Sequence, residues 1–216
     1  MDILKVIRDR KSTRGFLDKP VERETLERLL SLAIRAPSAI NLQPWEFVVV
    51  SGEERKRLSR LLVKRMREKN ISCGPDARGP LPKLFIARQK VLLDCMLPGI
   101  PEGLTFQEFI NEGSCNFYGA PTAVIINIDQ VFSSLHLTDI GIFVGYFVLA
   151  AHALGLGSCP IGMITAFGDD IKELLSIPDG KKVVIAIAVG YRDPDAKINH
   201  IRSERAPLAD VVRWLE

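Results

Sequence analysis

The longest apolar run of the sequence, IGIFVGYFVLAAHALGLG, occupies residues 140–157. It reaches the length of a membrane span only if His152 and its four glycines are counted with the apolar residues. Such an interrupted run is more typical of a helix in the core of a protein, and Gly155 and Gly157 are typical helix-ending residues. We therefore predict a long, buried central helix and no association with a membrane.

Three further apolar segments indicate strands. EFVVVS spans residues 46–51, TAVIINID spans 122–129, and KKVVIAIAVGY spans 181–191. The last is apolar throughout its centre, as expected of a strand that is buried on both faces. Hydrophobic periodicity and end signals predict helices as well. Those helices span residues 2–9, 22–35, 52–70, 134–157, 169–177 and 207–215. The mixture, with more helix than strand, predicts an α+β protein.

The length of 216 residues, with 47% hydrophobic and 25% charged residues, suits one sizeable core. No linker divides the chain, so we predict a single domain over residues 1–216. Residues 70–105 show only a weak pattern and contain the Pro- and Gly-rich stretches SCGPDARGPLP and MLPGIPEG. We interpret this segment as a variable, lid-like insertion, since motifs with chemical potential lie on both sides of it.

Charge and cysteine content exclude several kinds of site. The net charge of +3 is mildly basic and fits an anionic cofactor. Cations crowd residues 55–69, but no aromatic side chains alternate with them, so we predict a solvated helix face and no nucleic-acid binding. The four cysteines lack CxxC spacing and the three histidines are scattered, so we predict no metal site. With no signal peptide at the N-terminus, a reducing, cytoplasmic location is the simplest expectation.

RKSTR, residues 10–14, follows the first predicted helix and places three cations around two hydroxyls. Cations supply attraction for a phosphate, and hydroxyls and amides supply directional hydrogen bonds. An ordinary basic helix terminus, where cations interact with the helix dipole, would have the same composition. Both interpretations remain open on these residues alone.

APSAINLQPW, residues 36–45, connects a helix to a strand and is unusually rich in polar side chains. Ser38, Asn41 and Gln43 could recognise the edge of a heteroaromatic ring. The same residues could instead satisfy the loop's own backbone, while Trp45 packs in the core. We expect Trp45 to have that packing role in either case.

Two later segments carry weaker signals. GLGSCPIGM, residues 155–163, has small residues that allow a flat ligand to approach the backbone, although a helix end leading into a strand would look alike. In the tail NHIRSERAPLADVV, either Arg202 or Arg205 could bind a phosphate or simply be solvated.

The chain resembles the FMN-dependent nitroreductase family in six segments that follow one another along most of its length. They are RKSTRGF, APSAINLQPWEFVVV, FYGAPTAVIINID, DIGIFVGYFVLAAHALGLGSCPIGM, VVIAIAVGYRD and RAPLADVVRW. The resemblance implies a nitroreductase-like fold with a central mixed sheet flanked by helices. It also implies an intertwined homodimer with two FMN sites between the subunits and with helix 139–155 at the interface.

The resemblance implies which residues contact the phosphate side of FMN. Arg10, Ser12 and Arg14 match the positions that hold the phosphate, the ribityl chain and the pyrimidine edge, and Lys11 lies beside them. Arg205 matches a second phosphate ligand. We expect Arg14 and Lys11 to stabilise negative charge near N1 and C2 of the reduced ring.

The resemblance also implies two groups of residues around the flavin ring. One is a loop that reaches the flavin from the partner subunit: Pro37, Ser38, Ala39 and Asn41, with Gln43 close by. The other is a backbone segment that faces the ring near N5: Pro160, Ile161 and Gly162. Between residues 68 and 118 no flavin contacts of the better-known bacterial enzymes can be matched.

The implied activity is a ping-pong reaction in which NADH or NADPH reduces FMN. The reduced FMN then reduces a small nitroaromatic, quinone or similar electron-poor acceptor. The chemistry takes place on the cofactor, so no protein residue is assigned a catalytic role. Two alternatives remain: another flavin reaction on the same fold, such as dehalogenation, dehydrogenation or flavin breakdown, and a non-catalytic FMN-binding protein.

Overall fold

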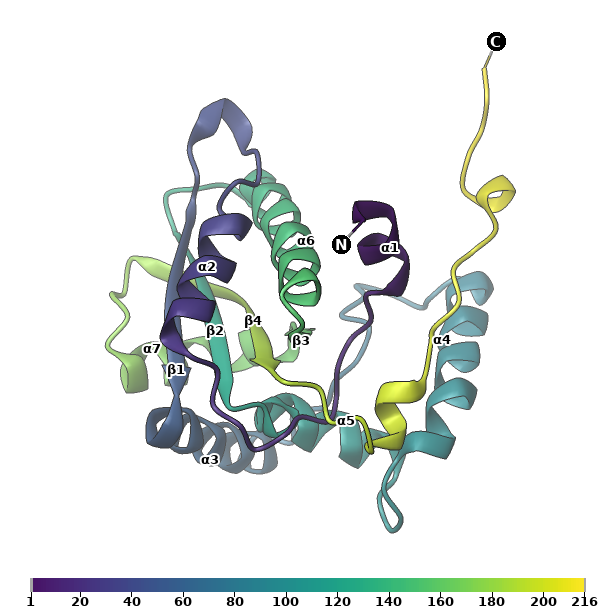
Figure 1. Cartoon of the computed structure of the whole chain (residues 1–216), viewed down its shortest axis with the longest axis horizontal. Coiled ribbons are helices and arrows are strands. Elements are labelled where there is room, and N and C mark those ends of the chain that lie inside the picture. The colour runs from purple at the N-terminus through teal and green to yellow at the C-terminus, as the bar shows by residue number, and fades with distance from the viewer. Residues whose placement is uncertain (1, 216) are drawn as a thin grey trace.

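The computed structural model describes residues 2–215 and has a four-stranded sheet at its centre (Figure 1). The strand order is β1-β2-β4-β3. The strands are β1 (Trp45–Ser51), β2 (Thr122–Asp129), β3 (Gly157–Ile161) and β4 (Lys181–Gly190). All three expected strands are present, which confirms the α+β class.

The prediction of a mixed sheet is wrong for the described residues, because all three strand pairs are antiparallel. Helix α6 (Leu137–Ala153) joins β2 to β3, and these two strands run in the same direction. However, β4 lies between them and is antiparallel to both. Among residues 2–215, parallel pairing occurs only at an isolated bridge between Ser12 and Ser158.

Helices cover both faces of the sheet. One apolar cluster joins the sheet to α2 (Arg23–Ala33) and α6, and the other joins it to α3 (Gly52–Glu68) and α7 (Gly168–Leu175), with α5 (Phe106–Cys115) at one side. In β2, Val124 and Ile126 belong to the first cluster, whereas Ala123 and Ile125 belong to the second. Burial on both faces explains why the central strands are apolar throughout.

Helix α6 forms as expected, and Gly155 follows it with φ +79°. It is not fully buried, however. The side chains of Phe143 and Phe147 are fully buried against the sheet, while Gly141 and Tyr146 are exposed. The segment Ser134–Ala153 is long and apolar enough to cross a membrane, and 33% of its most apolar window is buried. The expectation of a central helix therefore needs correction: α6 lies on one face of the sheet and has an uncovered side.

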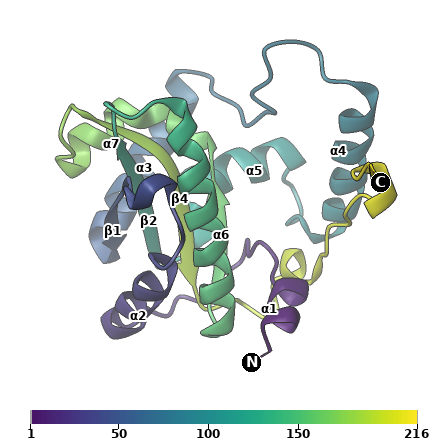
Figure 2. The ribbon, with the colours of Figure 1, turned by 90° about the horizontal axis from the view of Figure 1, so that it is seen from above.

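The structure differs from the sequence expectation in two segments. The weakly patterned insertion contains helix α4 (Lys83–Met96), whose apolar residues point in several directions and form no clear stripe. At the C-terminus, the helix expected over residues 207–215 is absent, and only a short 3₁₀ turn forms at Leu208–Asp210. A helix that short is marginal without packing partners, and this tail extends away from the sheet beside α4 (Figures 1 and 2).

The first helix, α1 (Ile3–Asp9), forms as expected and leads into residues 10–17, which reach β3 at the bridge between Ser12 and Ser158.

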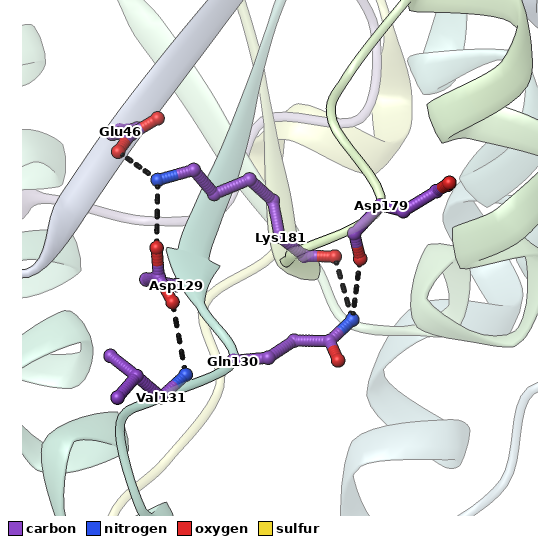
Figure 3. A network of polar contacts seen from close by, with 6 residues as sticks. All are labelled: Glu46, Asp129, Gln130, Val131, Asp179 and Lys181. Carbon is purple, nitrogen blue, oxygen red and sulfur yellow. Dashed lines mark hydrogen bonds and ion pairs between the residues drawn. The ribbon is translucent and has the colours of Figure 1, made fainter.

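At the end of the sheet where β1 and β4 begin, a polar network joins three strands (Figure 3). Lys181 Nζ contacts Glu46 Oε1 and, at 3.2 Å, Asp129 Oδ2. Gln130 Nε2 donates to the carbonyl oxygens of Asp179 (2.8 Å) and Lys181 (3.1 Å). The network ties β1 to β2 and β4 directly after the loop 36–45.

Candidate functional site

Residues 10–14 run along the outer edge of β3. The amide of Thr13 donates to the carbonyl of Ser158 over 2.9 Å, next to the Ser12–Ser158 bridge. Thr13 is buried, and it packs so closely on Gly157 that a Cβ there would lie 2.6 Å from Thr13 Oγ1. A side chain at position 157 would therefore push the two segments apart. The structure thus brings together residues 10–14 and the segment 155–163.

Asn199 fixes the conformation of this segment. Its buried side chain accepts a hydrogen bond from the amide of Arg14 (2.9 Å) through Oδ1. Its Nδ2 donates to the carbonyl oxygens of Gly15 (2.7 Å) and Asp193 (2.9 Å). Leu17 continues the contact by donating its amide to the carbonyl of Tyr191. Residues 10–17 are thereby held against both β3 and the end of β4.

Several cations meet here without carboxylate partners. The pKa of Arg10 is lowered by burial and by the nearby charge of Arg205, and the pKa of Lys11 is lowered by burial and by Arg192 and Arg202. Among residues 2–215, no carboxylate lies within 4.0 Å of these cations. Half-buried, mutually repelling cations favour the binding of an anion.

Arg14 adds an unsatisfied donor to this cation cluster. Its Nε is buried and, within the described chain, has no hydrogen-bond partner. Its guanidinium carbon lies 5.8 Å from the centroid of the Tyr118 ring, and burial raises the pKa of Tyr118. A buried N–H group normally has a partner, so an acceptor from a bound molecule would complete this arrangement.

Pro160, Ile161 and Gly162 form the end of β3 and the residue beyond it. Ile161 is buried, Pro160 is half-buried, and Gly162 is exposed. Because β3 is an edge strand, no further strand of residues 2–215 pairs with its outer side beyond the Ser12–Ser158 bridge. Burial raises the pKa of the adjacent Cys159, whereas the charges of Arg14 and Arg10 lower it, so both cations lie close to this strand. Residues 10–14 and 160–162 therefore border one region.

The loop 36–45 is folded largely by its own hydrogen bonds. The Ser38 hydroxyl accepts the amide of Gln43 (2.9 Å), and Gln43 Nε2 donates to Asn41 Oδ1 (3.2 Å). Asn41, Gln43, Pro37 and Ala39 are exposed. Trp45 is buried, with its ring 5.5 Å from that of Phe143, as the sequence analysis expected.

Within one chain, this loop does not meet the cation cluster. Its Ala39 amide binds Asp139 on the first turn of α6, whereas Gly157 follows the last turn. A helix of 17 residues is about 25 Å long at 1.5 Å per residue. Arg205 lies near Arg10, but its exposed side chain bonds to Ser203 and Glu204.

Sequence reasoning missed three residues of this region: Tyr118, Arg192 and Asn199. Asn199 contacts a residue 185 positions away, which no local pattern reveals. Tyr118 lies in the segment FYGAP, where its positive φ of 53° and its contact with Gly113 indicate a special conformation. Its position directly before the turn residues Gly119, Ala120 and Pro121 is the sequence signal that could have indicated it.

Comparison with known proteins shows the family of the chain. Residues 7–191 match the Nitroreductase family. The chain belongs to the nitroreductase family. It is 29% identical over 214 residues to nitroreductase NfnB of Mycolicibacterium smegmatis, covering 97% of this chain and 91% of the relative. It is also 29% identical over 215 residues to a 4-nitrobenzoate reductase of Pseudomonas putida, covering 93% and 89%.

The nitroreductase-like fold is confirmed by solved structures. The crystal structure of the FMN-dependent nitroreductase NfnB from Mycobacterium smegmatis in complex with NADPH superimposes with a TM-score of 0.88 at 29% identity. It covers 99% of this chain and 97% of that one. A nitroreductase with bound FMN from Bacteroides fragilis shares the fold at a TM-score of 0.68 and 22% identity, with full coverage of both chains.

Proposed function

We propose that this nitroreductase-family chain binds FMN and uses NADH or NADPH to reduce small nitroaromatic, quinone or similar electron-poor acceptors in a ping-pong reaction. Relatives that act on nitroaromatics, such as 4-nitrobenzoate reductase, support the substrate class. The observation that carries the proposal is the unpaired cation cluster beside the buried, unsatisfied Nε of Arg14. FMN carries both a phosphate anion and the ring acceptors that these groups lack.

In this proposal each residue group has a distinct role. Arg10 and Arg205 hold the phosphate, and Ser12 binds the ribityl chain. Arg14 and Lys11 place positive charge where the reduced ring becomes negative. Backbone from Pro160 to Gly162 lies against the ring near N5. When bound, FMN supplies the chemistry of accepting reducing equivalents from NAD(P)H and passing them to the acceptor.

We also propose that the functional unit is an intertwined homodimer. The loop residues Ser38 and Asn41 lie at the far end of α6 from the cation cluster, so a single chain leaves this wall of the site open. Helix α6 has an uncovered apolar side, with Tyr146 43% exposed. A second copy packed on that side would cover it and bring the partner's loop to the flavin.

Two further features complete the proposal. All four cysteines are free, which suits a reducing, cytoplasmic location. Residues 70–105, with α4, form a variable lid-like part of one domain over residues 1–216. Ion pairs within α3, such as Lys56–Glu53 and Arg65–Glu68, account for much of its basic face and agree with a solvated surface that binds no nucleic acid.

The test begins with the purified protein, which should be yellow or become yellow on reconstitution with FMN. Rapid mixing with NADH and NADPH should bleach the flavin band, and a nitroaromatic or quinone should restore it. Absence of FMN binding would refute the proposal. Binding without bleaching would indicate an FMN-binding protein, and turnover only with halogenated phenols would indicate a dehalogenase.

A further inference from the structure

Asp139 is a buried carboxylate to which the cofactor proposal gives no role. It lies on the first turn of α6 and is 6% exposed. Its Oδ1 accepts the amide of Ala39 over 3.1 Å, and its Oδ2 lies 2.9 Å from Nδ1 of His136. A buried carboxylate is unfavourable unless it is hydrogen-bonded, so these two contacts and the helix N-terminus stabilise it together.

The loop that Asp139 contacts has an unusual backbone. Ile40, Asn41 and Gln43 have φ values of 43°, 61° and 48°, in the left-handed region that residues other than glycine rarely adopt. Such conformations persist only where surrounding contacts impose them. Ser38 supplies one contact from inside the loop, and Asp139 supplies one from the body of the protein.

The attachment of the loop at its two ends is unequal. Beyond its end, β1 is held by the hydrogen-bonded sheet and by the contact between Glu46 and Lys181 (Figure 3). Near its start, the loop follows α2, and the contact between Ala39 and Asp139 joins it to α6, the helix at the proposed dimer interface. The position of Ser38 and Asn41 relative to the second copy therefore depends on Asp139.

We propose that Asp139 is a positioning residue, which holds the loop 38–43 in the shape that contacts the flavin of the partner subunit. This inference rests on the proposed function. Asp139 does not touch the cofactor; it acts through the amide of Ala39. His136 in turn orients the Asp139 carboxylate, leaving Oδ1 directed at the loop.

The test compares three variants with the wild-type dimer. Asp139→Ala removes both hydrogen bonds, whereas Asp139→Asn keeps an oxygen that can accept from Ala39. Asp170→Ala is the matched control, since Asp170 is a similarly covered carboxylate (side chain 11% exposed, against 8% for Asp139) on the first turn of α7 that pairs with Arg65 and Lys69 away from the loop. FMN dissociation constants are measured by equilibrium titration, and amide hydrogen exchange is followed in the FMN-free proteins.

Asp139→Ala should raise the FMN dissociation constant about tenfold, as expected for a lost hydrogen bond to a charged group. Exchange should accelerate at residues 39–43. Asp139→Asn should restore most of the affinity and protection, and Asp170→Ala should leave both at wild-type values. This pattern separates positioning from general destabilisation.

Two results would overturn the inference: Asp139→Ala binding FMN as tightly as the wild type, or Asp170→Ala weakening binding to the same extent. Failure of the proposed function would look different, because then the wild-type protein itself would bind no FMN. In that case the exchange measurement would still report whether Asp139 holds the loop.

Discussion

The segment 10–14 and the loop 36–45 are both rich in polar side chains, yet their hydrogen bonding differs. In the segment, Arg14 Nε is buried without a partner, and Arg10 and Lys11 face other cations. In the loop, backbone amides donate to acceptors of the same chain: Gln43 to the Ser38 hydroxyl, and Ala39 to the Asp139 carboxylate of α6. The first region presents unpaired cations that can bind an anion, whereas the polar groups of the second are hydrogen-bonded within the folded chain. A polar composition alone therefore does not distinguish a binding site from a self-contained loop. The hydrogen-bond partners of the polar groups do.

The largest expected effect concerns stability and belongs to the loop. Trp45→Ala removes a buried ring that packs on Phe143, which should lower the free energy of unfolding by about 3–5 kcal/mol. Chemical denaturation measures the loss. Val49→Ala on the same strand, where the side chain is 40% exposed, is the control and should cost far less. Equal losses would show that Trp45 is not a packing residue.

The next effect concerns the cation cluster. Arg10→Ala combined with Arg205→Ala should weaken FMN binding by at least about 150-fold, since each of the two charged hydrogen bonds is worth roughly 1.5–3 kcal/mol. Isothermal titration with FMN measures it. The double variant Arg57→Ala with Lys64→Ala removes the same number of cations from the ion-paired face of α3 and should bind FMN normally. If both double variants weaken FMN binding equally, the effect is one of overall charge and not of specific contacts with the phosphate.

A smaller effect should come from the loop side chains. Asn41→Ala should weaken FMN binding roughly fivefold, because one neutral hydrogen bond is worth about 1 kcal/mol. Asn41 is exposed in one chain, but its φ of 61° lies in the left-handed region, where Asn is tolerated better than Ala, so the unfolding free energy should fall by no more than about 1 kcal/mol. Parallel titration and denaturation check this, and a loss of stability without a loss of affinity would assign Asn41 to the loop's own folding.

The smallest effect is a pH dependence in the FMN-free protein. Burial and Arg192 lower the pKa of Lys11 below its ordinary value of 10.5, so the folded state releases this proton before the unfolded state does. The unfolding free energy should therefore rise as pH increases from the folded pKa toward 10.5. Thermal melts should show Lys11→Met to be more stable than the wild type at pH 7. The difference in stability should narrow as the pH rises from the folded pKa toward 10.5. A constant difference would contradict the burial of this charge.

Much of the fold was predictable from sequence because apolar periodicity reports burial. The strands 122–129 and 181–191 were placed correctly for that reason, and the helix expected over residues 134–157 forms over Leu137–Ala153. The antiparallel sheet was not, because the insertion of β4 between β2 and β3 depends on long-range pairing. The C-terminal helix was predicted from local residues, but a short segment without packing partners does not form a helix.

The candidate site was predictable in part. The segments 10–14 and 160–162 were identified, and they border one region. The contribution of Asn199 depends on a contact across most of the chain, and that of Tyr118 on a backbone conformation that its residue type does not indicate. The loop 36–45 is separated from this region because it contacts the first turn of α6, whereas the region lies beyond the last turn. The sequence does not indicate which end of α6 the loop contacts.

In the proposed homodimer, each flavin site combines the cation cluster of one copy with the loop of the other. Mixed dimers test it most directly: one chain carries Arg10→Ala with Arg14→Ala, and its partner carries Asn41→Ala. Each variant alone has two defective sites, but the mixed dimer should regain one site of wild-type FMN affinity. Pairing a wild-type chain with one that carries all three substitutions should give none. If the first mixed dimer has no site of wild-type affinity and the second pairing has one, a single chain builds both walls of each site, and the shared site is refuted.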